Sequence, residues 1–149
     1  MTLKSQILNQ YKQIVNDRIN VFQDMISALT EDSINDSKSS AGDKHETALS
    51  MMHIEQEKIN KKLSEILIQK LVLDKINPNL MSKKIALGSI IKTNGMILFM
   101  CTALPKIVVD SQTIIAVSTQ SPLGSKLLGN EIGFKFEINT TKYILEEVF

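Results

Sequence analysis

Residues 49–73 read LSMMHIEQEKINKKLSEILIQKLVL, and this stretch decides the fold of the first half of the chain. Its mainly apolar positions recur with alternating spacings of three and four residues, at Leu49, Met52, Gln56, Ile59, Leu63, Ile66, Lys70 and Leu73. Such a heptad repeat is typical of a helix that packs lengthwise against another helix, and Gln56 and Lys70 are its polar interruptions. The stretch therefore predicts one arm of a coiled coil.

The partner arm is predicted upstream, where a heptad pattern with one charged position runs through Leu8, Tyr11, Val15, Arg18, Phe22, Met25 and Leu29. Between the arms, residues 30–42 are rich in Ser, Asp and Asn and have no apolar period. Two heptad segments joined in this way predict an antiparallel helical hairpin. An arm of roughly 30 residues is about 45 Å long, which a domain of this size cannot bury, so we expect the hairpin to project.

The residue composition changes near Asn77-Pro78. Of the six glycines only Gly42 lies before this point, and all three prolines lie at it or beyond it. Glycine and proline are rare inside long helices and common in turns. We therefore expect a helical module in residues 1–77, a linker in residues 78–84 and a β domain in residues 85–149.

Five short runs in the second module have the composition of strands: residues 89–93, 96–102, 113–118, 133–139 and 142–148. Asn94-Gly95 predicts a two-residue hairpin turn because both residues tolerate positive φ. Residues 122–128 predict a short helix, with Ser121 as its N-cap and Gly129 just past its end. A small antiparallel sheet over this helix, in a chain of class α+β, would bury Ile90, Leu98, Ile115, Leu127, Leu128, Phe136 and Ile144.

Charge and cysteine content exclude several classes of protein. The 149 residues include 17 basic and 16 acidic side chains, and the formal charge of +1 argues against tight binding of free nucleic acid. Cys101 is the single cysteine, which excludes an internal disulfide and a cysteine-based zinc site. No run of about 18 apolar residues and no signal peptide is found, so we expect a cytoplasmic protein without a membrane span.

The most informative residues lie at the predicted turn of the hairpin, in Gly42-Asp43-Lys44-His45-Glu46. Asp43 and Glu46 are three residues apart at the start of a helix, so their carboxylates share one face. Residues 31–46 contain five acids and two lysines, a net charge of −3. A pair of carboxylates can provide hard oxygen ligands to a divalent metal such as Mg²⁺. The same pattern also fits a capping box, in which the acids only satisfy free backbone N–H groups.

Two other groups of residues carry weaker signals of chemistry. Lys58, Lys61 and Lys62 form a small basic cluster, which is usually a solvated helix face but can also contact a phosphate backbone. Cys101 lies in an apolar run, which favours a buried, inert thiol over a nucleophile. Neither group by itself indicates an enzyme.

The order of these features resembles the Gre-type transcript-cleavage factors of bacterial RNA polymerase. Gly42-Asp43-x-x-Glu46-Thr47-Ala48 is similar to the family's tip motif, Gly-Asp-x-x-Glu-Asn-Ala, and Glu55-Gln56 follows as in the family. The C-terminal signature of the family is a strand, Ser-Pro, a short helix and Leu-x-Gly-Lys. It is similar to Ile115-Ala116-Val117, Ser121-Pro122 and Leu127-Leu128-Gly129 here. The resemblance covers nearly the whole chain in order and spacing.

This resemblance implies an FKBP-like C-terminal domain that binds the rim of the polymerase secondary channel, with contact residues Ser121, Pro122, Leu127, Leu128 and Gly129. The hairpin would enter the channel and bring Asp43 and Glu46 to the active centre, where they would help to hold a second Mg²⁺ for cleavage of backtracked RNA. The residues near the RNA would be Lys44, Lys58, Lys61 and Lys62. We therefore expect a monomeric factor that is not an enzyme by itself, holds no cofactor tightly and meets RNA only through the polymerase.

Four positions depart from the family's pattern: Thr47 replaces an Asn, Leu49 an aromatic residue, Ile54 a basic residue, and Asn130 the Lys after Leu-x-Gly. These changes affect contacts expected near the RNA 3′ end more than contacts with the polymerase. Two alternatives therefore stay open. One is a Gre-like regulator that occupies the channel without stimulating cleavage, and the other is a coiled-coil adaptor with an unrelated protein partner.

Overall fold

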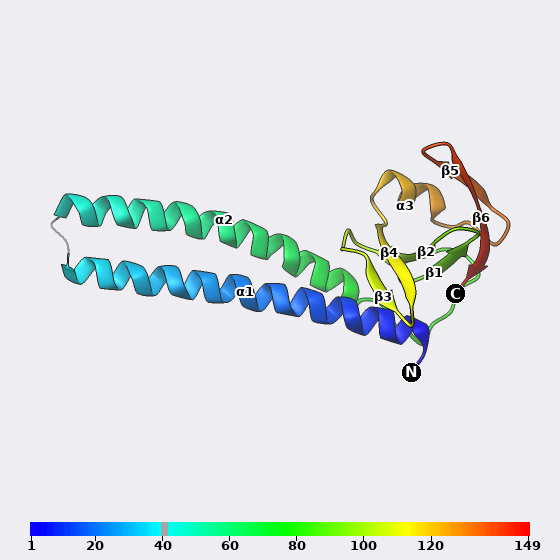
Figure 1. Ribbon diagram of the computed structural model, residues 1–149, viewed down its shortest axis with the longest axis horizontal. Helices are drawn as coiled ribbons and strands as arrows, with labels where there is room; N and C mark the ends of the chain where they lie inside the picture. Colours follow the sequence, from blue (N-terminus) through cyan, green and yellow to red (C-terminus); the bar gives the residue numbers. More distant parts are fainter. Residues whose placement is uncertain (40–41) are drawn as a thin grey trace. The chain divides into compact units, whose positions relative to one another are not determined.

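The computed structural model describes residues 1–39 and 42–149, and the side chains of residues 1–32 and 46–149. Two long helices precede a sheet and a short helix (Figure 1). In chain order the elements are α1 (Leu3–Ser39), α2 (Gly42–Asp74), β1 (Ile90–Thr93), β2 (Ile97–Cys101), β3 (Ile107–Val109), β4 (Gln112–Ser118), α3 (Pro122–Leu127), β5 (Lys135–Ile138) and β6 (Thr141–Val148). The expected class, α+β, is confirmed.

The described chain forms two compact units. The hairpin unit consists of Gln13–Lys70, and the globular unit consists of Met1–Lys12 together with Leu71–Phe149. This division differs from the predicted modules, 1–77 and 85–149, because the start of α1 and the end of α2 pack with the strands. One tie within the globular unit is the buried Lys4, whose Nζ donates a 2.7 Å hydrogen bond to the carbonyl of Leu80 in the predicted linker.

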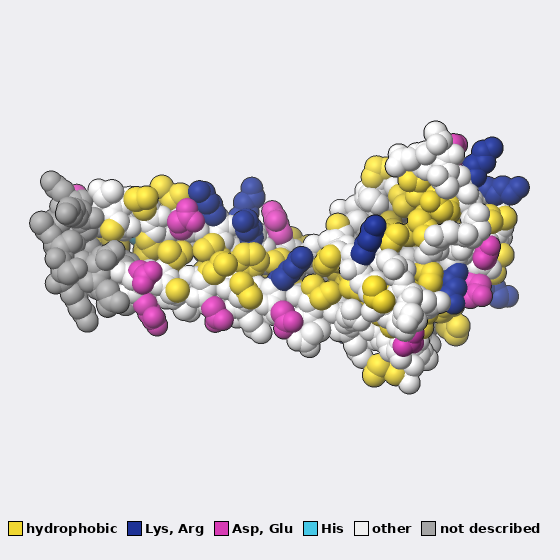
Figure 2. All heavy atoms as spheres, in the orientation of Figure 1, with side chains coloured by type: hydrophobic (Ala, Val, Ile, Leu, Met, Phe, Trp, Pro, Cys, Tyr) yellow, Lys and Arg dark blue, Asp and Glu magenta, His cyan; other side chains and the backbone are white. Residues whose placement is uncertain are grey.

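In the hairpin unit, α1 and α2 run side by side in opposite directions (Figure 1). Every heptad position predicted between residues 49 and 70 is shielded from solvent, Ile66 fully and the others in part. The polar position Gln56 contacts the partner helix, because its Nε2 donates a 3.1 Å hydrogen bond to Thr30 Oγ1. Figure 2 shows hydrophobic side chains between the two helices, with acidic side chains along α1 and both basic and acidic ones along α2. The antiparallel hairpin expected from the sequence is present.

The pattern predicted for α1 is wrong at two positions. Arg18 and Met25 are exposed, whereas Ile19 is buried and Ile26 is half-buried. Each isoleucine is one residue beyond the predicted position, whereas Phe22 and Leu29 are half-buried as predicted, so the seam shifts at these two positions only. The shift shields two β-branched aliphatic side chains and leaves the Arg18 guanidinium in water, which is the arrangement of lower free energy.

α1 continues further toward its connection with α2 than the sequence predicts, whereas α2 begins within one residue of its predicted start. α1 ends at Ser39 and α2 begins at Gly42, so most of residues 30–42, expected to form a polar connecting segment, are helical. Ser, Asp and Asn cost only about 0.5 kcal/mol each relative to Ala inside a helix, so a polar segment can extend a helix that is already formed. The side chains of Asp43 and Lys44 lie outside the described residues.

Six strands form one mixed sheet in the order β3-β4-β2-β1-β6-β5. The expectation of an antiparallel sheet is wrong at one pair, because β2 and β4 are parallel, with Phe99 beside Ala116. The cause is β3, a strand that the sequence pattern did not predict. It forms the outer edge, and a turn at Asp110-Ser111, with both residues at positive φ, returns the chain between β3 and β2.

The turn at Asn94-Gly95 joins β1 to β2, as predicted, but for a different reason. Neither residue is among those with positive φ. Instead, Thr93 Oγ1 accepts hydrogen bonds from the backbone N–H groups of Gly95 at 3.2 Å and Met96 at 3.0 Å. The side chain of Asn94 makes a contact outside the turn. Its Oδ1 accepts a 3.0 Å hydrogen bond from the Ile144 N–H, which joins the turn to β6.

One face of the sheet packs against α3. The core on this face contains Ile85, Ile91, Leu98, Met100, Val117, Leu127, Phe136 and Leu145. Of the seven core residues predicted from the sequence, Ile90, Leu98, Leu127 and Phe136 are buried, and Ile115 and Ile144 are half-buried. Leu128 was predicted in the core and is 38% exposed. It is the C-cap residue of α3, directly after the buried Leu127.

The opposite face of the sheet is covered by the beginning of α1. Tyr11 is fully buried, and its ring stacks on Phe99 of β2 with centroids 6.0 Å apart. The Tyr11 hydroxyl donates a 2.9 Å hydrogen bond to the carbonyl of Pro105. Cys101, at the end of β2, is also buried within the globular unit. Because both faces are covered, residues 98–101 of β2 are buried without alternation.

We expect the free energy of unfolding to fall between pH 9 and pH 11 because of Cys101. Burial raises the pKa of its thiol from 9.0 to about 11, so in this range the folded chain keeps a proton that the unfolded chain releases. The unfolded state binds fewer protons, and stability therefore falls as the pH rises, by about 2 kcal/mol. Burial also raises the pKa of Tyr11, which acts in the same direction at higher pH.

Urea unfolding at about pH 8 and about pH 10.5 measures this effect. The loss of stability between the two pH values should be smaller by about 2 kcal/mol in the Cys101→Ala protein than in the parent. Because the loss is taken between two pH values within the same protein, the constant destabilisation caused by the smaller alanine side chain cancels. Equal losses in the two proteins would contradict the assignment to Cys101.

Candidate functional site

The predicted metal-binding pair lies at the beginning of α2. Because α2 starts at Gly42, Asp43 and Glu46 belong to its first turns. The Glu46 side chain is exposed to solvent, and the side chain of Asp43 lies outside the described residues. A carboxylate near the N-terminus of a helix is favoured by the partial positive charge of the backbone there.

The basic cluster of α2 is exposed. Lys58 Nζ lies 3.4 Å from Glu55 Oε1, one turn earlier on the same helix. Lys61 and Lys62 are exposed, and in the part of the chain that the structure describes they have no ion pair. The cluster therefore offers two unpaired ammonium groups and one whose charge is shared with an acid.

Glu46 can act as a metal ligand only with help from other groups. Among the side chains that the structure describes, no three His, Cys, Asp or Glu groups come together to hold a metal ion. Mg²⁺ prefers six oxygen ligands and usually takes one or two carboxylates from a protein. The Glu46 carboxylate is exposed and is a hard oxygen donor, so it fits a site that is completed by another molecule.

The second candidate site is the segment at α3, and its local structure agrees with the sequence. Ser121 caps the helix: its Oγ accepts the Gly124 N–H at 2.9 Å and donates to the Ser118 carbonyl at 2.7 Å. Pro122 occupies the first turn, where no N–H is needed. Gly129 follows the helix with φ +80, a conformation that favours glycine.

Only part of this segment can contact a partner. Leu127 is fully buried in the core, and the Ser121 hydroxyl is occupied by the cap. Pro122 and Gly129 are exposed, and Leu128 is an exposed large apolar side chain. Ile132, which follows shortly, is also exposed. The α3 surface, which we define as Pro122, Leu128, Gly129 and Ile132, is therefore the part available to another protein.

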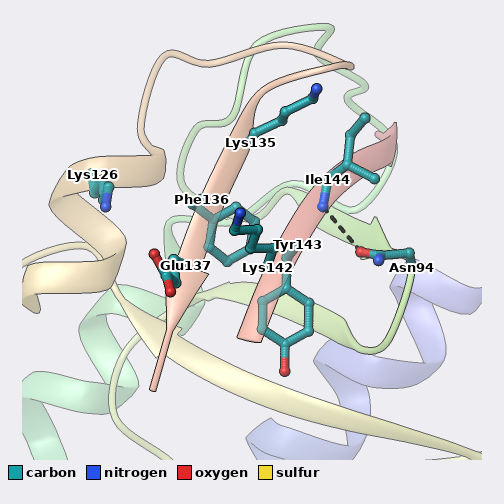
Figure 3. Close-up of a pocket in the computed structure, with 8 residues that line it drawn as sticks. All are labelled: Asn94, Lys126, Lys135, Phe136, Glu137, Lys142, Tyr143 and Ile144. Atoms are coloured by element: carbon teal, nitrogen blue, oxygen red, sulfur yellow. Dashed lines mark hydrogen bonds between the residues drawn. The ribbon is translucent and has the colours of Figure 1, made fainter. Parts of the chain in front are cut away.

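The structure also contains a hollow that the sequence did not predict. It has a volume of about 540 Å³ and lies beside α3 along the β5–β6 hairpin (Figure 3). We call it the lysine cleft, after three of its lining residues, which are Asn94, Lys126, Lys135, Phe136, Glu137, Lys142, Tyr143 and Ile144. These residues come from four separate segments. Their proximity depends on sheet order, which no local pattern specifies.

Two further findings bear on the class of protein. Within the described residues, no helix combines the length and the apolar character that crossing a membrane requires. No protein-family model and no curated protein matches this chain. Function is therefore inferred from the residues of the hairpin, the α3 surface and the lysine cleft.

Proposed function

We propose that this protein is a Gre-type elongation factor: its hairpin enters the secondary channel of bacterial RNA polymerase and assists Mg²⁺-dependent cleavage of backtracked RNA. The observation that carries the proposal is a long two-helix hairpin with Asp43 and Glu46 at the start of its second helix. In this proposal the protein acts as a monomer in the cytoplasm. It binds the polymerase and meets RNA only there.

The length of the hairpin supports this role. Within the hairpin unit each helix contributes a little under 30 residues, which corresponds to about 40 Å. Its shielded heptad positions, including the Gln56–Thr30 hydrogen bond, resist separation of the two helices. A slender and stiff element of this length suits a narrow channel that a globular unit could not enter.

In the proposed complex, Asp43 and Glu46 share Mg²⁺ with groups of the polymerase. The ion supplies charge stabilisation and activates water for attack on a phosphodiester. The contribution of this chain is to hold two carboxylates one helical turn apart on a rigid support. Lys61 and Lys62, which have no ion pair within the described residues, are available to RNA phosphates.

The globular unit is proposed to be FKBP-like and to bind the channel rim through the α3 surface. Leu128 is 38% exposed and Ile132 is 65% exposed, so apolar area is available for burial against a partner. The Ser121 cap and buried Leu127 keep the segment in one conformation, which lowers the entropy cost of binding. Leu127 therefore contributes to binding through the position of Leu128.

A pull-down with purified bacterial RNA polymerase tests the proposal. We expect the parent protein to bind and Leu128→Asp to weaken binding by about tenfold or more, because a carboxylate would be buried in an apolar contact. Val108→Asp is the matched control, since Val108 is an exposed aliphatic residue on the edge strand β3. Failure of the parent protein to bind polymerase would contradict the proposal and favour the coiled-coil adaptor.

One observation favours the second candidate, a channel-binding regulator without cleavage activity. Ile54 stands where the family often has a basic residue, and its side chain is 52% exposed. An exposed isoleucine cannot pair with an RNA phosphate, so one contact to the RNA would be absent. Such a protein would still occupy the channel and would compete with an active cleavage factor.

A further inference from the structure

The three lysines of the lysine cleft come from three different secondary-structure elements. Lys126 comes from α3, Lys135 from β5 and Lys142 from β6. Figure 3 shows Lys126 on α3 at the left, Lys135 at the top, and Phe136 and Lys142 near the centre of the view. The turn at Asn139-Thr140 has both residues at positive φ and sets the pairing of β5 with β6, which places Glu137 opposite Lys142.

The charges of the cleft are unbalanced. Three lysines line the cleft beside a single acidic residue, Glu137. Lys126, Lys135 and Lys142 are all exposed, and none of them forms an ion pair with any residue that the structure describes. Like charges held around one hollow attract an anion, and the effect is strongest for a ligand that contacts two or more of them.

The wall of the cleft is aromatic and held in place. The rings of Phe136 and Tyr143 stack with centroids 5.4 Å apart. The Tyr143 ring also rests on Gly95, where an added Cβ would lie 3.1 Å from its Cε1 atom. The backbone N–H of the neighbouring Ile144 donates a hydrogen bond to Asn94 Oδ1, drawn in Figure 3, which holds this end of β6 in place, while the Ile144 side chain lies on the opposite face of the strand from the Tyr143 ring. A rigid apolar wall of this kind favours a ligand with a flat, weakly polar part.

We propose that the lysine cleft binds a nucleoside phosphate, with the phosphate against the lysines and the base against the ring of Tyr143. A volume of about 540 Å³ lies in the range of small-ligand sites. An acidic peptide would use the lysines and leave the aromatic wall uncovered, and an apolar ligand would leave three cations without a partner. The nucleoside phosphate is either free or the terminal unit of a single-stranded RNA. The inference is independent of polymerase binding.

Titration of the full-length, ¹⁵N-labelled protein with AMP, inorganic phosphate and adenosine tests the proposal by NMR. We expect AMP to shift the amide signals of residues 135–137 and 142–144 in a saturable way, with Kd at least about tenfold below that of either fragment. Lys135→Gln and Lys142→Gln should each raise Kd about threefold to tenfold, and Glu137→Gln should lower it. Lys106→Gln is the control, an exposed lysine beside β3 at the opposite edge of the sheet.

Additional arms of the experiment separate the possible ligands. A 5′-phosphorylated hexanucleotide RNA that shifts the same amides more tightly than AMP identifies RNA as the source of the nucleotide and supports the proposal. Equal binding of AMP and phosphate overturns the nucleoside part. Displacement of AMP by a glutamate decapeptide at lower concentration overturns the proposal in favour of an acidic protein segment. Absence of saturable shifts at the cleft residues overturns it altogether.

Discussion

The double variant Asp43→Asn/Glu46→Gln is expected to lose RNA cleavage in stalled polymerase complexes by about 100-fold or more while it still binds polymerase. Removing two carboxylates from a metal-assisted reaction removes charge stabilisation at the reacting phosphate, and effects of this size correspond to about 3 kcal/mol in the barrier. The measurement is the rate at which purified protein shortens the RNA in such complexes at fixed Mg²⁺. A pull-down on the same samples reports binding separately.

The choice of amides separates metal chemistry from helix capping. Asn caps a helix about as well as Asp, and Gln can replace Glu in a capping box, so the double amide keeps the cap and loses the charges. Glu57→Gln is the control, because Glu57 is an exposed acid further along the same helix. Cleavage by the double amide at the parental rate would show that the acids only cap α2. A parent protein that inhibits another cleavage factor and has no activity of its own would identify the regulator instead.

The helical half of the fold was predictable because its pattern is local. All heptad positions of α2 in the hairpin unit are shielded, and the polar Gln56 has a partner across the hairpin in Thr30. The prediction for α1 failed where two faces of the helix carry similar apolar content: Arg18 competes with Ile19, and Met25 with Ile26. The spacing of apolar residues does not decide which of two neighbouring helix faces is buried. The free-energy cost of burying the Arg18 guanidinium does decide it, because it favours burial of Ile19 instead.

The sheet was less predictable because its order depends on contacts between distant residues. β3 is only three residues long, and its signal is the pair of short apolar runs on either side of Asp110-Ser111. Residues with this turn chemistry support a two-residue hairpin, which would have indicated β3 and β4 as partners. Nothing local indicates that β4 then pairs with β2 in parallel.

The candidate sites also differ in how far local sequence predicts them. The α3 segment follows from Ser121, Pro122 and Gly129, whose roles in starting and ending a helix are local. The lysine cleft could be anticipated only in part, since the Asn139-Thr140 turn predicts that Glu137 pairs with Lys142. That Lys126 of α3 lies at the same hollow follows from tertiary packing alone.

Gly124→Ala is expected to destabilise the globular unit by about 3 kcal/mol or more, because an added Cβ at this position would lie 1.8 Å from the Ser118 carbonyl oxygen. That oxygen cannot simply move away. It accepts hydrogen bonds from the Ser121 N–H at 3.1 Å and the Ser121 hydroxyl at 2.7 Å, and the same hydroxyl caps α3. A shift that admits the methyl group therefore breaks the cap and displaces the α3 surface, so polymerase binding should weaken with stability.

Urea unfolding of Gly124→Ala measures this cost, and two neighbouring substitutions identify its cause. Gly129→Ala meets no atom within 4 Å but has φ +80, so it reports backbone strain alone, at about 1 kcal/mol. Ser125→Ala removes an exposed side chain and should change stability by less than about 0.5 kcal/mol. If Gly124→Ala costs no more than Gly129→Ala, the close approach to Ser118 does not constrain the segment. If it costs far more, as we expect, this contact between β4 and α3 determines where Pro122 and Leu128 are presented to a partner.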